Sequence, residues 1–206
     1  FFFLLREVRA RSIQSSSSEG LVRDLWLAIQ NGEGEKGLRL SANNFECNLL
    51  VGESLLGKKR GKAALPYFQR AVEVDPENDR AHEILGKAFL QGKKRVEALA
   101  SFEEAYRLGR KESALVEIGA LLLSQKKYLD VVARLEEISS KNSNALILVA
   151  RSFFALKQPA RAVPLLEKGV QAPSATVDTW NLLGKAYRSV GNRAEAKKIS
   201  MVVKSF

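Results

Sequence analysis

The sequence is poor in the residues from which metal and catalytic centres are most often built. Its 206 residues include one cysteine, one histidine and one methionine. Cys47 has no partner for an internal disulfide, which favours a reducing intracellular compartment, either the cytoplasm or a mitochondrial or other organellar matrix. His82 has no second histidine with which to hold a metal ion. We therefore expect no metal and no cofactor.

Long hydrophobic runs are also missing. The longest uncharged apolar stretches are residues 1–5, 118–123 and 145–150, whereas a membrane-spanning helix needs roughly 18 residues. We therefore expect no membrane span. Segment 1–18 is rich in arginine and serine and resembles an organellar transit peptide, and a plain N-terminal extension is the alternative.

One set of spacings recurs along the chain. Small residues follow one another at intervals of 34, 33, 31 and 34 residues, at Gly52, Gly86, Gly119, Ala150 and Gly184. The same intervals separate Ala64, Ala98, Val131, Ala162 and Ala196. They also separate the bulky residues Phe68, Phe102, Leu135 and Leu166 from one another and from the polar Ser200. Repetition with this period indicates a stack of similar supersecondary units.

Each unit contains two blocks with helical periodicity around a polar turn, such as Asp79–Gln91 and Val96–Leu108. No strand-length stretch alternates with period two, so the sequence predicts helices alone. Pro66 and Pro164 fall within second blocks. We expect both in or near the first turn of a helix, where backbone N–H groups have no intrahelical acceptor.

These residues resemble the tetratricopeptide repeat. The last unit matches its pattern at Trp180, Leu183, Gly184, Tyr187 and Ala196, and the first at Gly52, Ala64, Phe68, Ala71 and Pro76. The resemblance implies an all-α fold, a right-handed α-solenoid of stacked antiparallel helix pairs. It covers residues 45–206 as five repeats, at 45–78, 79–111, 112–142, 143–176 and 177–206.

The two ends of the chain fit no complete repeat. Segment 19–44 is expected to form a capping helix or a degenerate half-repeat. At the other end, an apolar face would remain uncovered over Ile199, Val202, Val203 and Phe206. Solenoids usually finish with a polar cap, so we expect either a truncated chain or a partner docked there.

The motifs favour a protein without enzymatic activity. Residues 52–59 approach a phosphate-binding loop, but Lys59 stands where a serine or threonine would hold magnesium. His82 occupies a packing position of the repeat. Cys47 lacks a basic or histidine neighbour in sequence, so we interpret it as a structural thiol.

Some members of the family bind acidic chaperone tails through a carboxylate clamp of lysine, asparagine and arginine residues. In register, the clamp positions hold Leu49, Glu53, Ile84, Ser113 and Glu117. Moving the frame by one repeat gives Glu83, Lys87, Glu117, Asn144 and Leu148. Neither set forms the clamp, so heat-shock chaperone tails are not expected as partners.

The resemblance implies that the first helix of each pair lines a concave face. The residues expected there are Leu49, Leu50, Leu56, Ile84, Lys87, Leu90, Val116, Ile147, Arg151, Phe154, Lys185 and Arg188. An apolar groove with scattered cations suits an amphipathic or acidic segment of a partner protein. Two alternatives are packing between neighbouring repeats and occupation by residues 1–5.

Positive charge is concentrated in the turns within the helix pairs. Twelve basic residues stand there with no acidic residue among them: Lys58, Lys59, Arg60, Lys62, Lys93, Lys94, Arg95, Lys126, Lys127, Lys157, Arg161 and Arg193. The formal net charge is +10, from 33 basic and 23 acidic residues, so these turns account for the whole excess. We expect a basic ridge, and solvated turns are the alternative.

The sequence therefore favours a scaffold or adaptor that binds partner proteins within a larger complex. The runner-up is an RNA-contacting component of a ribonucleoprotein, such as an organellar ribosome, that uses the basic ridge. The turns contain no interspersed aromatic residues on which bases would stack.

Overall fold

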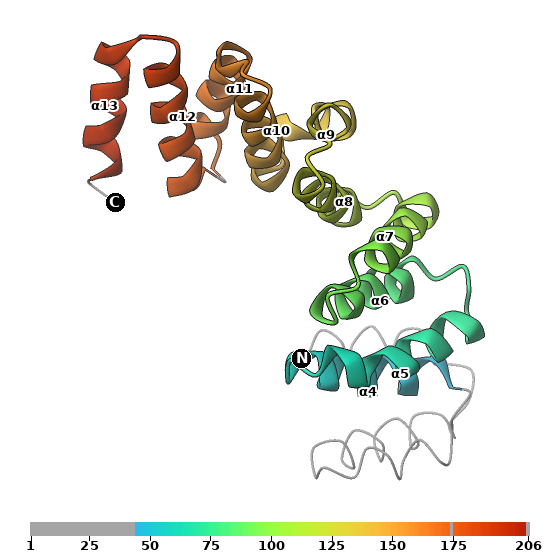
Figure 1. Ribbon diagram of the computed structural model, residues 1–206. Coiled ribbons are helices and arrows are strands. Elements are labelled where there is room, and N and C mark those ends of the chain that lie inside the picture. The colour runs from blue at the N-terminus through green and yellow to red at the C-terminus, as the bar shows by residue number, and fades with distance from the viewer. Residues whose placement is uncertain (1–43, 174, 205–206) are drawn as a thin grey trace. The chain divides into compact units, whose positions relative to one another are not determined.

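The computed structural model describes residues 44–173 and 175–204, and within them every regular element is helical (Figure 1). Two compact units divide between Gly109 and Arg110. The predictions for segment 1–18, for all of segment 19–44 except Asn44, and for Phe206 lie outside the described residues.

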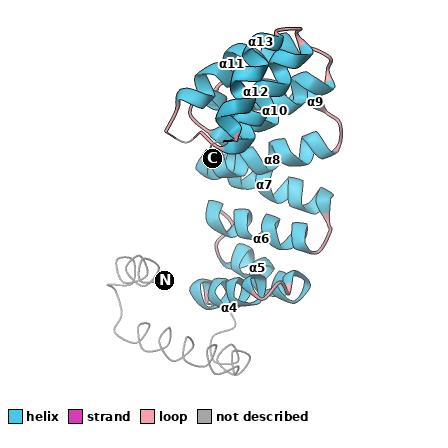
Figure 2. Cartoon of the chain, turned by 90° about the vertical axis from the view of Figure 1, so that its left-hand side faces the viewer, coloured by secondary structure: helices cyan, strands magenta, loops and turns pink. Residues whose placement is uncertain are grey.

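The described part of the first unit, residues 44–109, contains two helix pairs, and Figure 2 shows their helices. Helix α4 (Phe45–Gly57) pairs with α5 (Gly61–Val74), and α6 (Asp79–Gln91) pairs with α7 (Arg95–Gly109). Helix α5 also packs against α6, and α4 touches α6. The first helices of the two pairs are therefore neighbours.

The described part of the second unit contains three helix pairs, and the first helix of the middle pair contacts the first helices of the pairs on both sides. In the first of these pairs the second helix is short and is followed by one turn of 3₁₀ helix. The elements are α8 (Glu112–Ser124), α9 (Tyr128–Leu135), η1 (Ile138–Ser140), α10 (Ser143–Ala155), α11 (Pro159–Gln171), α12 (Val177–Ser189) and α13 (Arg193–Val203).

Polar residues begin most of the first helices. The side chain of Asn44 accepts a hydrogen bond from the backbone N–H of Cys47 at 3.0 Å, and Asn78, Asn142 and Thr176 cap α6, α10 and α12 in the same way. Each cap satisfies an N–H group that has no partner within the helix, which stabilises a helix by about 1 kcal/mol. The sequence thus sets where these four helices begin.

The glycine and phenylalanine columns of the repeat meet inside the helix pairs. A Cβ atom on Gly52 would lie 2.4 Å from Cε1 of Phe68, and one on Gly86 would lie 2.9 Å from Cε1 of Phe102. Both rings are fully buried. The small residue therefore allows the two helices to approach closely enough for the ring to fill the space between them.

The expected position of the two prolines was wrong by about one turn. Pro66 and Pro164 are the sixth residues of α5 and α11, beyond the N–H groups that lack an intrahelical acceptor. Each therefore removes one intrahelical hydrogen bond. Both prolines are exposed, so water can bond the backbone carbonyl that each leaves without a donor.

Candidate partner-binding surfaces

Within the described residues, the five first helices end in the same backbone geometry. At the end of α4, the N–H of Lys59 donates to the carbonyl of Leu56, and the N–H of Arg60 donates to that of Leu55, both at 2.9 Å. This bond pair defines a Schellman motif, in which one residue adopts a left-handed conformation. The left-handed residues of the five turns are Lys59, Lys93, Lys126, Lys157 and Gly191.

Lysine is an unfavourable residue for that position. The four lysines have φ values between 58° and 62°, a region that costs an L-residue about 1–2 kcal/mol and costs glycine almost nothing. The remaining non-glycine residue with positive φ in the described chain is Arg110, also basic. Basic residues thus occupy positions in these turns at which glycine would give a more stable protein. The charge of these lysines was visible in the sequence, but their left-handed backbone was not predicted. The available signal was Gly191, which stands in register with them.

The two basic turns of the first unit lie side by side. Nε2 of Gln91, at the end of α6, donates a hydrogen bond to the carbonyl of Leu56 in α4, at 3.1 Å. A shallow depression of about 380 Å³ opens there, lined in part by Lys59, Arg60 and Lys62. The structure thus brings together seven exposed cations, Lys58, Lys59, Arg60, Lys62, Lys93, Lys94 and Arg95.

Little negative charge offsets this cluster within the described chain. Lys94 lies 3.9 Å from Glu97, and both side chains are about half exposed, so the pair contributes little. Lys94 also lies 5.8 Å from the centre of the Phe89 ring. The other six cations form no ion pair with a described residue.

The basic turns of the second unit are not all alike. Lys126, Lys127, Lys157 and Arg193 are exposed and unpaired within the described residues. Arg161 is also exposed, but its guanidinium lies 4.5 Å from the centre of the Phe153 ring and 3.8 Å from Glu136. Arg161 therefore contributes to packing as well as to surface charge.

Two residues predicted to line the groove belong to the core. Leu49 is 2% exposed and Ile84 is 8% exposed, so neither offers a surface to a partner, and this part of the prediction is corrected. Periodicity cannot distinguish a side chain that faces the groove from one that packs against the neighbouring helix. The remaining apolar residues predicted there are half-buried: Leu50, Leu56, Leu90, Val116, Ile147 and Phe154.

The charges on the first helices of the first unit are paired with one another. Arg80 of α6 reaches Glu53 of α4 at 2.8 Å, and Lys87 pairs with Glu83 one turn away at 2.7 Å. Lys87, predicted as a groove cation, thus has its charge compensated.

In the second unit, the ammonium of Lys185 lies 4.7 Å from the centre of the Phe154 ring, which joins α12 to α10. Arg151 and Arg188 are exposed and form no ion pair with a described residue. Among the charges that lie on the first helices themselves, the arginines without an ion pair are therefore those of α10 and α12.

A hydrogen bond links α11 to α12 behind this surface. The hydroxyl of Tyr187 donates to Oε1 of Glu167 at 2.5 Å. This bond, with burial and the negative charge of Glu167, raises the pKa of Tyr187 to about 12. The phenol therefore stays protonated as a donor well beyond neutral pH.

The residues that were weighed as catalytic or phosphate-binding candidates have surroundings typical of structural residues. His82 Nε2 lies 2.9 Å from the carbonyl oxygen of Pro76, and Cys47 is buried. Residues 52–57 lie within α4. Among the described residues, no cluster of three or more acidic, histidine or cysteine side chains could hold a metal ion. None of the described helices is both long and apolar enough to cross a bilayer.

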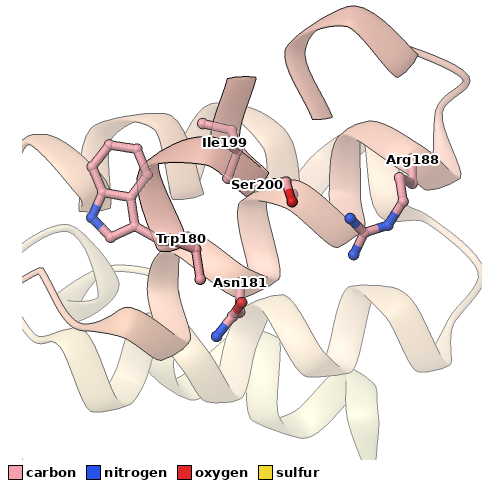
Figure 3. Close-up of a pocket in the computed structure, with 7 residues that line it drawn as sticks. Trp180, Asn181, Arg188, Ile199 and Ser200 are labelled. Atoms are coloured by element: carbon pink, nitrogen blue, oxygen red, sulfur yellow. The ribbon is translucent and has the colours of Figure 1, made fainter. Parts of the chain in front are cut away.

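A small pocket that the sequence analysis did not predict lies between α12 and α13. Its volume is about 60 Å³, and Figure 3 shows Trp180 and Arg188 at its two ends, with Ile199 and Ser200 of α13 between them. Asn181 and Gly184 of α12 also line it. Apolar and cationic groups thus face the same space.

Comparison with known proteins supports the repeat assignment. Models of the family described as tetratricopeptide repeat match residues 50–114 and 177–201. No curated protein matches the chain. Among solved structures, PilW, described as a type IV pilus biogenesis factor, is similar over 93% of this chain and 94% of its own, with a TM-score of 0.70 and 17% identity.

Two other solved structures have the same fold. YrrB, described as a TPR protein with an unusual peptide-binding site, is 16% identical over 80% of this chain and 87% of its own, with a TM-score of 0.64. MamA from Desulfovibrio magneticus is 16% identical over 78% and 93%, with a TM-score of 0.69. At these identities the likeness concerns the fold, an all-α solenoid of stacked helix pairs.

Proposed function

Because this chain belongs to the tetratricopeptide-repeat family, we propose that it is a non-enzymatic scaffold or adaptor that binds partner proteins within a larger complex. Repeat folds of this kind host many functions, so the fold alone does not select one. The basic turns and the face of the first helices support this function more specifically than the fold does. YrrB, with its peptide-binding site, is a precedent for peptide recognition by this fold.

The observation that carries the proposal is the left-handed lysine in four of the five turns. A turn that served only to connect two helices would be more stable with glycine at that position, as at Gly191. Retention of a cation at a cost of about 1 kcal/mol or more each favours a role for the charge. Solvation alone would not require it, since exposed positions nearby offer lysine an ordinary conformation.

The second surface is the face formed by the first helices within each unit. The half-buried aliphatic side chains there would anchor an amphipathic helix or an extended segment of a partner. Arg151 and Arg188, which have no acidic partner within the described chain, would pair with acidic residues that flank those anchors. A partner segment with apolar anchors and acidic flanks thus fits both the groove and the basic turns.

The cluster of seven cations in the first unit favours one alternative. Exposed, nearly uncompensated charges beside a shallow depression would also track a phosphate backbone, as in an RNA-contacting component of a ribonucleoprotein. Binding of that kind would weaken steeply with added salt. A protein partner held through apolar anchors would respond much less.

Affinity capture from the native source tests the proposal. The chain is used as bait at low and high salt, with and without nuclease. A second bait carries glutamate in place of six ridge lysines: Lys58, Lys59, Lys93, Lys94, Lys126 and Lys127. A control bait has the same charge change at exposed basic residues outside the turns: Arg70, Lys111, Lys141, Lys168, Lys197 and Lys204.

We expect a defined set of proteins that resists nuclease, remains with the control bait and is reduced by reversal of the ridge. Loss of the captured proteins on nuclease treatment would contradict the scaffold function and support the ribonucleoprotein function. Equal capture by the ridge and control variants would show that the turns only solvate the protein and that the groove binds the partner. Capture of no defined set from the native source would contradict both functions.

A further inference from the structure

The pocket between α12 and α13 exists because the last repeat departs from the pattern of the others. In the first repeat, the Phe68 ring fills the space over Gly52. Ser200 stands in register with Phe68 and is too short to do so. A Cβ atom on Gly184 would lie 3.3 Å from Cγ2 of Ile199 and 3.7 Å from Nη1 of Arg188, so the Ile199 side chain covers part of the space over this glycine. The pocket therefore opens beside Ile199, next to the glycine position over which an earlier repeat packs a phenyl ring.

A second departure from the repeat pattern places a positive charge at the pocket. The position of Arg188 is apolar in the other four repeats, where it is held by Leu56, Leu90, Leu123 and Phe154. Nη1 of Arg188 lies close to Gly184, and the guanidinium has no ion pair with a described residue. The side chains that line the pocket include no aspartate or glutamate. The space is thus suited to an apolar group with an anionic neighbour.

The third repeat shows that a side chain from outside the helix pair can reach the corresponding space. A Cβ atom on Gly119 would lie 2.4 Å from Cδ1 of Leu135, the residue in register with Ser200, and 3.5 Å from Cδ1 of Leu148. Leu148 belongs to α10, the first helix of the following pair. An apolar side chain presented by a neighbouring segment therefore packs over the repeat glycine.

We propose that the pocket over Gly184 binds a phenylalanine- or leucine-sized side chain of a partner protein, and that a carboxylate beside that side chain pairs with Arg188. The size of the side chain follows from the rings and leucines that fill this space in other repeats. The carboxylate follows from the uncompensated guanidinium. The inference rests on the proposed function, because the occupant is a segment of a protein partner, and it adds the chemistry that this segment must carry.

The test uses the ¹⁵N-labelled chain and three blocked peptides. The probe is acetyl-Ala-Glu-Phe-Ala-amide, and the two controls carry glutamine for glutamate or alanine for phenylalanine. Binding is followed through the indole N–H of Trp180 and the backbone amides of α12 and α13. We expect saturable shifts with the probe, about tenfold weaker binding of the glutamine peptide and no saturation with the alanine peptide.

Three variants place the binding at this pocket. Ser200→Phe restores the residue type of the earlier repeats and should abolish binding, whereas Ser140→Phe, at an exposed serine of η1, should leave it unchanged. Arg188→Leu should bind the glutamate and glutamine peptides equally. Circular dichroism checks the fold of each variant, and Ser200→Leu replaces Ser200→Phe if the phenylalanine variant does not fold.

Absence of saturable shifts at α12 and α13 with the probe would overturn the inference, as would unchanged binding to folded Ser200→Phe. If either result is obtained and the capture experiment still yields a defined set of proteins, the pocket is not a binding site and the scaffold function is retained. Binding of the probe by a chain that captures no protein would contradict the scaffold function instead.

Discussion

Replacement of Lys59 by glycine should stabilise the protein, although it removes a long side chain and a charge from an exposed turn. Lys59 has a φ of 58° at the left-handed position of the Schellman motif that ends α4. The strain relieved by glycine is about 1–2 kcal/mol. Against this, glycine adds conformational freedom to the unfolded chain, which costs about 0.4–1 kcal/mol. The net gain expected is about 0.5–1 kcal/mol.

The assay is urea denaturation followed by far-ultraviolet circular dichroism. With a urea slope of about 2 kcal/mol per molar, a gain of this size moves the midpoint of the affected unit upward by about 0.3–0.5 M. The complementary variant Gly191→Lys places lysine at a φ of 83°. Its midpoint should fall by a similar amount.

Two controls separate backbone strain from charge. Lys58, the neighbouring residue, has a φ of −79°, so Lys58→Gly should stabilise nothing. Lys59→Gln removes the charge but keeps a side chain in the left-handed region, and should leave the midpoint close to that of the unmodified chain. If Lys59→Gly is no more stable than Lys58→Gly, the strain assigned to these turns is wrong, and the argument for functional charge fails with it.

Two further predictions concern packing and pH. Gly52→Ala would force a methyl group against the Phe68 ring and should lower the free energy of unfolding by about 1–3 kcal/mol, measured by heat or urea. Gly57→Ala meets open space at the end of the same helix and should be neutral or stabilising. Equal effects of the two variants would contradict the close approach of α4 and α5. Tyr187→Phe removes the hydrogen bond to Glu167 and should cost about 1–2 kcal/mol near neutral pH. Folding raises the pKa of Tyr187 from 10 to about 12. The stability that the hydrogen bond adds is therefore complete below pH 10 and is lost between about pH 10 and 12. A stability difference between the two proteins that persists unchanged at pH 12 would refute this prediction.

The repeat register predicted the interior well because it encodes a steric requirement. The spacing of glycine and phenylalanine columns was visible in the sequence, and the structure shows Phe68 in contact with Gly52. A ring of that size fits only over a residue without a Cβ atom. The same register contained the signal for the left-handed lysines, since Gly191 stands in line with them. That signal was missed because lysine carries no intrinsic preference for positive φ.

The groove was harder to predict, for a geometric reason. Leu49 and Leu50 are adjacent and equally apolar, yet Leu49 is buried and Leu50 is half-exposed. Neighbouring residues on a helix are separated by about 100°, so a small rotation of the helix decides which of the two is covered. That rotation depends on the packing of the neighbouring helices.

The sequence by itself determined the helix pairs, their caps and the location of the excess positive charge, because these depend on spacing and residue type within a few turns of chain. Only the tertiary structure decided which charges remain uncompensated. Lys87 forms an ion pair with Glu83 on its own helix, and Arg80 forms one with Glu53 on another helix. Arg188 has no ion pair within the described residues. Pairing of that second kind joins residues 27 positions apart, and it requires the stacking of helices that local sequence does not specify.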